Sequence, residues 1–237
     1  MNNPDLSTLT LSRGSHKSRA DGVCAMEVVA WLAGEPHSDR PQNTCPIIAA
    51  FVRRWNDDLD DEDRNRLLLP LLPLLVGSRS TPEVENRRAL LAIDWQIRTS
   101  TPAWLDLVPD LAQHAAALRA LPEVNEQTAE QAMGVALAAK AAAKAAAVGA
   151  AWGTAEATAL AAAGAAAVAA AWAAAGAAAR TAALDAAVAA ARTAAKGAAG
   201  DAAEATLTPT VATLQRSAVA LIGRMIAVSA DNIQETT

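Results

Sequence analysis

The stretch Lys140-Ala-Ala-Ala-Lys144-Ala-Ala-Ala-Val148 opens the part of the sequence that decides the fold. It belongs to residues 129–206, in which 45 of 78 residues are alanine and none is proline. Alanine has the highest intrinsic helix propensity, and this preference adds up along a stretch of such length. The sequence therefore predicts an all-α protein that contains a long Ala-rich helical region.

Within this region nearly every fourth residue is something other than alanine. An α-helix advances about 100° per residue, so a period of four overshoots one turn by roughly 40° and the non-alanine residues wind around the helix. The period differs from the 3.5 residues of a left-handed coiled coil and favours right-handed wrapping. Alanine on all sides permits close approach between helices. The apolar residues that we expect to pack there are Trp152, Leu160, Val168, Trp172, Leu184 and Val188.

The length of the Ala-rich region leaves two architectures open. A single helix of about 78 residues would be a rod roughly 115 Å long. Such a rod would expose a large alanine surface, so we expect the region to pack against itself or against copies of the protein. An antiparallel helical hairpin that turns at glycines is the intramolecular solution.

Two further interpretations of the same region are weaker. Residues 157–179 carry no charge and are long enough to span a bilayer. However, insertion into a membrane rewards Leu, Ile, Phe and Val rather than Ala, and this segment has few larger apolar residues. An ice-binding helix would need a flat threonine face. The threonines of the region share no regular spacing; they are Thr154, Thr158, Thr181, Thr193 and Thr206.

The rest of the chain divides by composition. We expect a flexible, polar arm over 1–20, a helical globular domain over 21–122, the Ala-rich region over 123–206, an amphipathic helix over 207–229 and a disordered tail over 230–237. Helix boundaries inside the first domain are predicted by a stop at Gly34, a proline start at Pro46 and an acidic start near Asp61. Three Thr-Pro pairs, at Thr81, Thr101 and Thr208, predict further helix starts.

Charge and cysteine content narrow the class of protein. The net charge of −5 argues against a nucleic-acid partner and against binding to anionic membranes. Two cysteines, Cys24 and Cys45, do not make a disulfide scaffold. Residues 1–21 are polar and contain no apolar secretory segment. We therefore expect a cytoplasmic protein, and no small-molecule partner is indicated.

One polar cluster in the first domain carries the residue types of a chemical site. Cys24 and Glu27 are three residues apart and share a helix face, and Glu35, His37 and Asp39 follow in the next loop. Cys24, His37 and Asp39 are possible zinc ligands by type, although their spacing matches no strong metal pattern. Cys24 with His37 as base is a possible nucleophile. The structural alternative is a buried cysteine, a helix-capping acid and a loop held by side-chain hydrogen bonds.

The segment from Cys24 to Asp39, Cys-Ala-Met-Glu-Val-Val-Ala-Trp-Leu-Ala-Gly-Glu-Pro-His-Ser-Asp, resembles one found in uncharacterised actinobacterial and actinobacteriophage proteins. The similarity extends through Trp55-Asn56-Asp57, Thr101-Pro102-Ala103-Trp104 and the Ala-rich tetrapeptide repeat. The chain departs from that pattern at Arg40, where the family often has His. The resemblance implies an actinobacterial or phage origin and synthesis inside a bacterial host, and it brings no established activity.

The sequence therefore favours a non-enzymatic structural or protein-interaction protein. In this hypothesis the Ala-rich repeat acts as a spacer or as a self-association element. A small metal-dependent or cysteine-dependent site in the first domain is the alternative, and membrane association through 157–179 is a further one.

Overall fold

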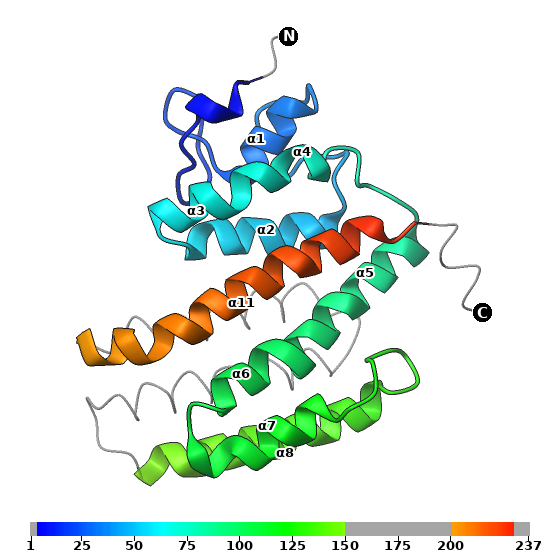
Figure 1. The fold of residues 1–237 in the computed structure, drawn as a ribbon. Coiled ribbons are helices and arrows are strands. Elements are labelled where there is room, and N and C mark those ends of the chain that lie inside the picture. Colours follow the sequence, from blue (N-terminus) through cyan, green and yellow to red (C-terminus); the bar gives the residue numbers. More distant parts are fainter. Residues whose placement is uncertain (1–3, 150–200, 230–237) are drawn as a thin grey trace. The chain divides into compact units, whose positions relative to one another are not determined.

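The computed structural model describes residues 4–149 and 201–229, and every regular element within these ranges is a helix (Figure 1). The predicted all-α fold class is confirmed, and so is a helix near the C-terminus. The chain divides into two compact units, Met1–Ala89 with Ile222–Thr237, and Leu90–Leu221. Each unit is described by itself below.

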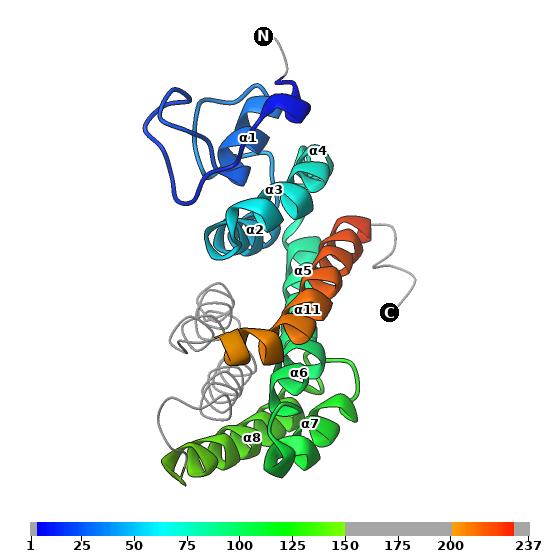
Figure 2. The same ribbon diagram turned by 60° about the vertical axis from the view of Figure 1, so that its left-hand side comes forward.

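The first unit is built from short helices. It contains the 3-10 turn η1 (Leu6–Thr8), α1 (Ala25–Leu32), α2 (Pro46–Asp58), α3 (Asp61–Leu68), the 3-10 turn η2 (Leu69–Leu71), α4 (Leu72–Leu75) and the start of α5 (Pro82–Trp95). Helix α1 packs on both α2 and α4 (Figures 1 and 2). The buried side chains between these helices include Met26, Val29, Ile48, Phe51, Val52, Leu72 and Leu75.

The boundaries of these helices follow from local chemistry. Gly34 has a φ of +71°, a left-handed conformation that glycine adopts without steric cost and that ends α1. Helix α2 begins at Pro46, whose missing N–H would have no partner in a first turn. Helix α3 begins at Asp61, because the Asp60 side chain accepts the N–H of Asp63 and acids fill the first turn. These three predicted boundaries are confirmed.

A buried arginine holds the end of helix α11 (Asp201–Ala227) in the first unit. The Arg88 side chain donates through Nε to the Met225 carbonyl at 2.7 Å and through Nη2 to the Val228 carbonyl at 3.0 Å. The last carbonyls of a helix have no partner within it, so a guanidinium there satisfies them.

The second unit contains the remainder of α5, the π-helical turn η3 (Gln96–Ser100), α6 (Thr101–Leu105), the 3-10 turn η4 (Pro109–Leu111), α7 (Ala112–Arg119), α8 (Ala129–Gly149) and α11 up to Leu221. Helix α7 packs against α6 and α8 (Figure 2). The helix starting at Pro82 was predicted from Thr81 and is confirmed, with the Val84 N–H 3.5 Å from the Thr81 hydroxyl.

Helix α6 begins at Thr101, as predicted, and Pro102 lies in its first turn. The predicted N-cap role of Thr101 is wrong, because α5 passes through the π turn η3 into α6 without an intervening loop. Pro102 has no N–H to continue an α-helical ladder. The wider π turn accommodates it: the Thr101 N–H and the Thr101 hydroxyl both donate to the Gln96 carbonyl. The threonine therefore bonds the preceding turn instead of capping a new helix.

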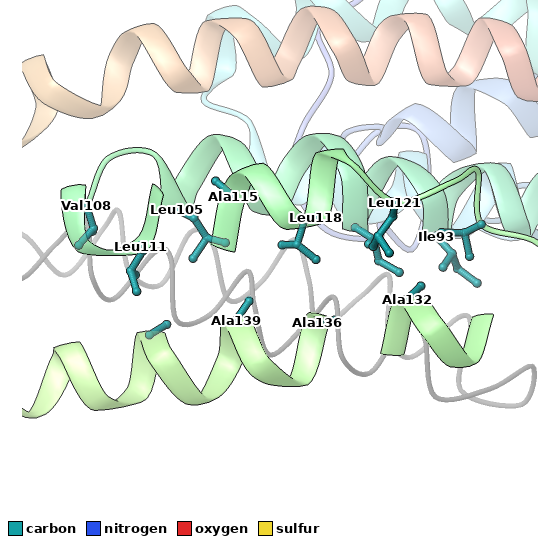
Figure 3. Close-up of a cluster of buried hydrophobic side chains, with 13 residues drawn as sticks. Ile93, Leu105, Val108, Leu111, Ala115, Leu118, Leu121, Ala132, Ala136 and Ala139 are labelled. Carbon is teal, nitrogen blue, oxygen red and sulfur yellow. The ribbon is translucent and has the colours of Figure 1, made fainter. Parts of the chain in front are cut away.

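The core of the second unit joins leucines to alanines. Helix α8 buries Ala132, Ala136, Ala139 and Ala143, each at most 1% exposed. Their spacing of four, three and four residues places them on one helix face. Opposite this face lie larger side chains from α5, η3, α6, η4, α7 and the following loop (Figure 3). These are Ile93, Ile97, Leu105, Val108, Leu111, Leu118 and Leu121.

Helix α11 begins earlier than predicted. A start at Thr208 and Pro209 is wrong, because the helix runs from Asp201 with Pro209 inside it. An internal proline removes one hydrogen bond and costs about 3 kcal/mol. Packing on both sides offsets this cost: Leu207 is buried against Trp104, and Val211 and Leu214 pack on the same cluster. The predicted apolar face is confirmed at Ala218, Leu221, Ile222 and Met225, which are all buried.

The predicted domain boundary differs from the observed one, and several other predictions concern residues outside the described ranges. The domain boundary predicted at Pro122 does not coincide with the division of the units, because the hairpin of α7 and α8 joins the start of the Ala-rich region to the helices before it. The packing residues predicted from Trp152 to Val188, the choice between rod and hairpin, the segment 157–179 and the tail 230–237 lie outside the described residues. Within 4–149 and 201–229, no helix is long and apolar enough to cross a membrane.

The alanine face of α8 yields a test by matched substitutions. Ala136 is 0% exposed and Ala138 is exposed on the same helix. We expect Ala136→Leu to lower the free energy of unfolding by about 1–3 kcal/mol, because the added methylenes overfill a packed interface. Ala138→Leu should change it by less than about 0.5 kcal/mol. Urea unfolding followed by circular dichroism measures both, and equal effects would contradict the described packing.

Candidate functional site

Glu27 is the centre of the polar cluster in the first unit. It lies in the first turn of α1, and its side chain is 1% exposed. The backbone N–H of Cys24 donates to Glu27 Oε2 at 2.8 Å. The first N–H groups of a helix lack partners within the helix, and a carboxylate three residues after the cap supplies one. The predicted helix-capping role of this acid is therefore present.

The same carboxylate holds the chain that precedes the helix. The backbone N–H of His16 donates to Glu27 Oε1 at 2.6 Å, and the His16 ring nitrogen Nδ1 lies 2.8 Å from Oε2. A carboxylate with a depressed pKa only accepts hydrogen bonds, so the proton of this contact sits on His16 Nδ1. The backbone and the ring of His16 thus donate hydrogen bonds to both oxygens of the buried Glu27 carboxylate.

His37 approaches from the loop after α1. Its Nε2 lies 3.1 Å from the backbone carbonyl of His16 and 3.6 Å from Glu27 Oε1. A carbonyl accepts and cannot donate, so His37 Nε2 carries the proton. Among the contacts of the described residues, the other ring nitrogen, Nδ1, is buried and has no hydrogen-bond partner. Two histidines and one buried carboxylate therefore converge at the N-terminus of α1.

Hydrogen bonds set the charge state of Glu27. Burial favours the neutral acid and raises the pKa of Glu27, but the backbone N–H groups of His16 and Cys24 donate to the carboxylate, and the His16 ring adds to them. Together these donors outweigh burial and hold the pKa of Glu27 below its ordinary value. Glu27 is therefore a buried carboxylate anion at neutral pH.

The predicted cysteine nucleophile is placed in an unsuitable environment. Burial raises the pKa of the Cys24 thiol to about 12, despite opposing hydrogen bonds, and the nearby Glu27 charge adds to the rise. A nucleophilic cysteine needs a lowered pKa, because the thiolate is the reactive form. Cys24 is 1% exposed and forms the N-cap position of α1. Its surroundings are those of a structural residue.

Glu35 and Asp39, the other two residues predicted for the polar cluster, make hydrogen bonds elsewhere. The Glu35 carboxylate accepts the backbone N–H groups of Gln42 at 2.6 Å and Asn43 at 2.8 Å, which closes the loop before α2. Asp39 offers its backbone carbonyl to Arg53 at 3.1 Å.

The sequence indicates Cys24, His37 and Asp39 as possible zinc ligands. Across the two described ranges, no group of three or more His, Cys, Asp or Glu side chains is arranged to hold a metal ion. Zinc binding stays a prediction.

His16 is the member of the site that sequence reasoning missed, because it falls in the expected flexible arm. In the structure this part of the arm is hydrogen-bonded to helices, and Leu11 within it is 1% exposed. One signal was present in the sequence: Gly22 stands between His16 and α1. Its φ of +126° suits glycine, and a Cβ there would meet the His16 ring at 2.9 Å.

Both oxygens of Glu27 are occupied by donors from the same chain. The arrangement therefore ties three segments together: the arm at His16, the N-terminus of α1 at Cys24 and the following loop at His37. A buried carboxylate must be hydrogen-bonded in this way, because an unpaired one would cost several kcal/mol. The geometry is that of a structural anchor.

The depressed pKa of Glu27 predicts a pH dependence of stability. Since the pKa is lower in the folded than in the unfolded chain, the stabilisation is present above the ordinary value of 4.5 and is lost as pH falls through the folded value. At pH 7, we expect Glu27→Gln to lower the free energy of unfolding by about 1–3 kcal/mol. This difference should shrink as the pH falls below the ordinary value of 4.5, because the carboxylate then becomes protonated in the unfolded chain first and in the folded chain at lower pH.

Urea unfolding at a series of pH values measures this effect. Glu62→Gln, at an exposed residue in the first turn of α3, is the matched control and should cost under about 1 kcal/mol. A constant difference between wild type and Glu27→Gln down to pH 3 would contradict the anchor.

Two glycines separate backbone strain from contact with His16. Gly14 and Gly22 both have positive φ, but a Cβ at Gly14 would have nothing within 4 Å. We expect Gly14→Ala to cost about 1–2 kcal/mol through its backbone conformation alone. Gly22→Ala should cost more and should shift the NMR signals of the His16 ring, because that ring must move. Equal losses of stability and an undisturbed His16 signal would show that Gly22 is not needed for this contact.

Comparison with known proteins gives no indication of what this site does. The chain matches no protein-family model, and neither a curated protein nor a solved structure is significantly similar to it. The resemblance to actinobacterial and phage proteins stays a prediction from the residues quoted above. What the protein does is therefore argued from its own contacts.

Proposed function

We propose that the protein is a non-enzymatic structural or protein-interaction protein, whose Ala-rich region acts as a spacer or self-association element. The observation that supports this proposal best is the packing of α8. Among its described side chains, up to Ala143, the buried ones are alanines, and they share a core cluster with larger apolar side chains of the second unit. Small side chains let helix backbones approach closely, which makes an Ala-rich helix a good packing partner for other helices.

The opposite face of α8 supports a role in association. Leu137 is 47% exposed, and Ala138 and Ala141 beside it are exposed as well. The alanine composition continues from α8 through the sequence to residue 206. Exposed apolar surface on a helix is removed from water when a second helix covers it, at about 25 cal/mol per Å². Copies of the chain supply such helices to one another.

The polar cluster around Glu27 also supports a non-enzymatic role. Glu27 and Cys24 have the surroundings of structural residues, with the carboxylate bonded by its own chain and the thiol pKa raised to about 12. A cytoplasmic location belongs to this proposal because residues 1–21 are polar and the two cysteines form no disulfide scaffold. An origin in actinobacteria or their phages belongs to it through the resemblance alone. The metal, membrane and ice-binding alternatives stay predictions.

Light scattering coupled to size-exclusion chromatography tests self-association. Across a range of about 1–100 μM, the range in which weak association is populated, we expect the mass to rise above the 24.3 kDa of one chain. Charges placed at two expected packing residues, Val168→Glu with Trp172→Glu, should return it to one chain, because buried unpaired charges are costly.

The matched control adds two charges at exposed residues outside α8, Gln113→Glu with Gln127→Glu. It should leave an interface made by Val168 and Trp172 intact. A mass of one chain at every concentration in the wild-type protein would overturn the self-association part of the proposal.

A further inference from the structure

Residues 11–16, here called the arm segment, are held by side chains of three helices. The N–H of Leu11 donates to Asn65 Oδ1 at 2.8 Å, and the N–H of Gly14 donates to Asp57 Oδ1 at 2.8 Å. The N–H of His16 donates to Glu27 Oε1 at 2.6 Å. The segment is thus recognised through its backbone at three positions.

The carbonyls of the arm segment are bound as well. Asn56 Nδ2 donates to the Ser12 carbonyl at 2.9 Å, and Arg64 Nη1 lies 3.5 Å from the Leu11 carbonyl. The Leu11 side chain is 1% exposed and supplies an apolar anchor. Backbone hydrogen bonds combined with a buried side chain are the usual elements of peptide recognition. The residues that provide them, here called the arm-binding surface, are Glu27, Asn56, Asp57, Arg64 and Asn65.

The arm-binding surface is fixed by contacts that do not involve the arm. Arg64, whose side chain is 2% exposed, donates to the carbonyls of Asn56 at 2.7 Å and Leu59 at 2.6 Å. Asn56 accepts the N–H of Ala25 at 3.1 Å. Groups held in place before a ligand arrives lose little entropy when it binds. The surface is therefore a preorganised receptor for a peptide of this kind.

The link between the arm segment and its receptor is exposed. Residues 17–21 lie at the surface and form a turn in which the Ser18 hydroxyl donates to Asp21 and the Asp21 N–H donates to the Ser18 carbonyl. Arg19 stacks over Trp31, 4.2 Å from the ring centroid. These contacts are local and near the solvent, where each contributes about 1 kcal/mol or less. The connector therefore adds little to the hold on the arm segment, which comes from the contacts with Glu27, Asp57 and Asn65.

We propose that the arm-binding surface also accepts the arm segment of a second copy of this chain, by reciprocal exchange. After exchange, the arm segment of one chain makes the same hydrogen bonds to the arm-binding surface of the other chain. The two states differ in the conformation of the connector and in the entropy lost when two chains associate. The proposal rests on the proposed self-association. When copies are held together, the second arm reaches an effective concentration of about millimolar and competes with the arm of the same chain.

Complementation between two full-length variants tests this exchange. Leu11→Ala with His16→Ala weakens the arm and leaves the surface, whereas Asp57→Ala with Asn65→Ala weakens the surface and leaves the arm. In a mixture, the intact arm of the second variant fits the intact surface of the first. We expect the two variants to pair at least about tenfold more tightly with each other than either does with itself, measured by fluorescence energy transfer between labelled chains.

A mixture that pairs no more tightly than its components would overturn the exchange. If the wild-type mass still rises with concentration, the proposed self-association stands and the exchange alone fails. If the mixture pairs while wild-type protein stays a single chain, exchange stands and the role of the Ala-rich region fails. Circular dichroism checks that both variants are helical.

A second measurement covers the case in which a double variant does not fold. A fluorescent peptide of residues 6–19 is added to full-length Gly22→Ala, in which the surface is unchanged and the arm is disturbed at the His16 ring. We expect saturable binding at least about tenfold stronger than to wild type, and loss of binding when the peptide carries Leu11→Ala and His16→Ala. Equal binding of both peptides, or binding of neither, would overturn the proposal.

Discussion

The constraint on which the first unit depends is that a buried carboxylate must be surrounded by donors. Glu27 is 1% exposed, and it obtains those donors from residues 11 positions earlier and 3 positions earlier, at His16 and Cys24. Because the charge cannot be left unpaired, the chain before α1 has to return to it. The loop that carries His37 then closes over the same point. One acid thus determines where three segments meet.

The two units use opposite kinds of contact. In the first, polar side chains of helices bind the backbone of a neighbouring segment, with Arg64 and Asn56 buried to do so. In the second, α8 places alanine methyl groups against leucines, and close approach replaces polar specificity. Both arrangements hold parts of the same chain together. In both, the bound element, an arm segment or an Ala-rich helix, is one that a second copy of the chain also contains. An assembly role is therefore consistent with each.

The sequence predicted the helical class because alanine propensity and capping signals are local properties. The helix starts at Pro46 and Asp61 and the stop at Gly34 depend on neighbouring residues alone. The helix start at Thr101 was also predicted, but its cap was not, because the Thr101 hydroxyl donates to the Gln96 carbonyl of the preceding π turn. The error at Pro209 arises where packing overrides a local signal, since Leu207 and Val211 pack on both sides of that proline. Three of the five residues predicted for the polar cluster, Cys24, Glu27 and His37, do meet. His16 was missed because residues 1–20 are polar and lack a helical or strand periodicity, a pattern that predicts a flexible arm.

The central claim is that buried Glu27 and the polar side chains of the arm-binding surface hold the arm segment in place. Amide hydrogen exchange, followed residue by residue or in peptides covering 10–17, tests it most directly. If the claim is right, the amides of Leu11, Gly14 and His16 exchange slowly in wild type, and the same amides accelerate in Glu27→Gln while those of α2 remain protected. Exchange of these three amides at the rate of a free peptide in the wild-type protein would contradict the account.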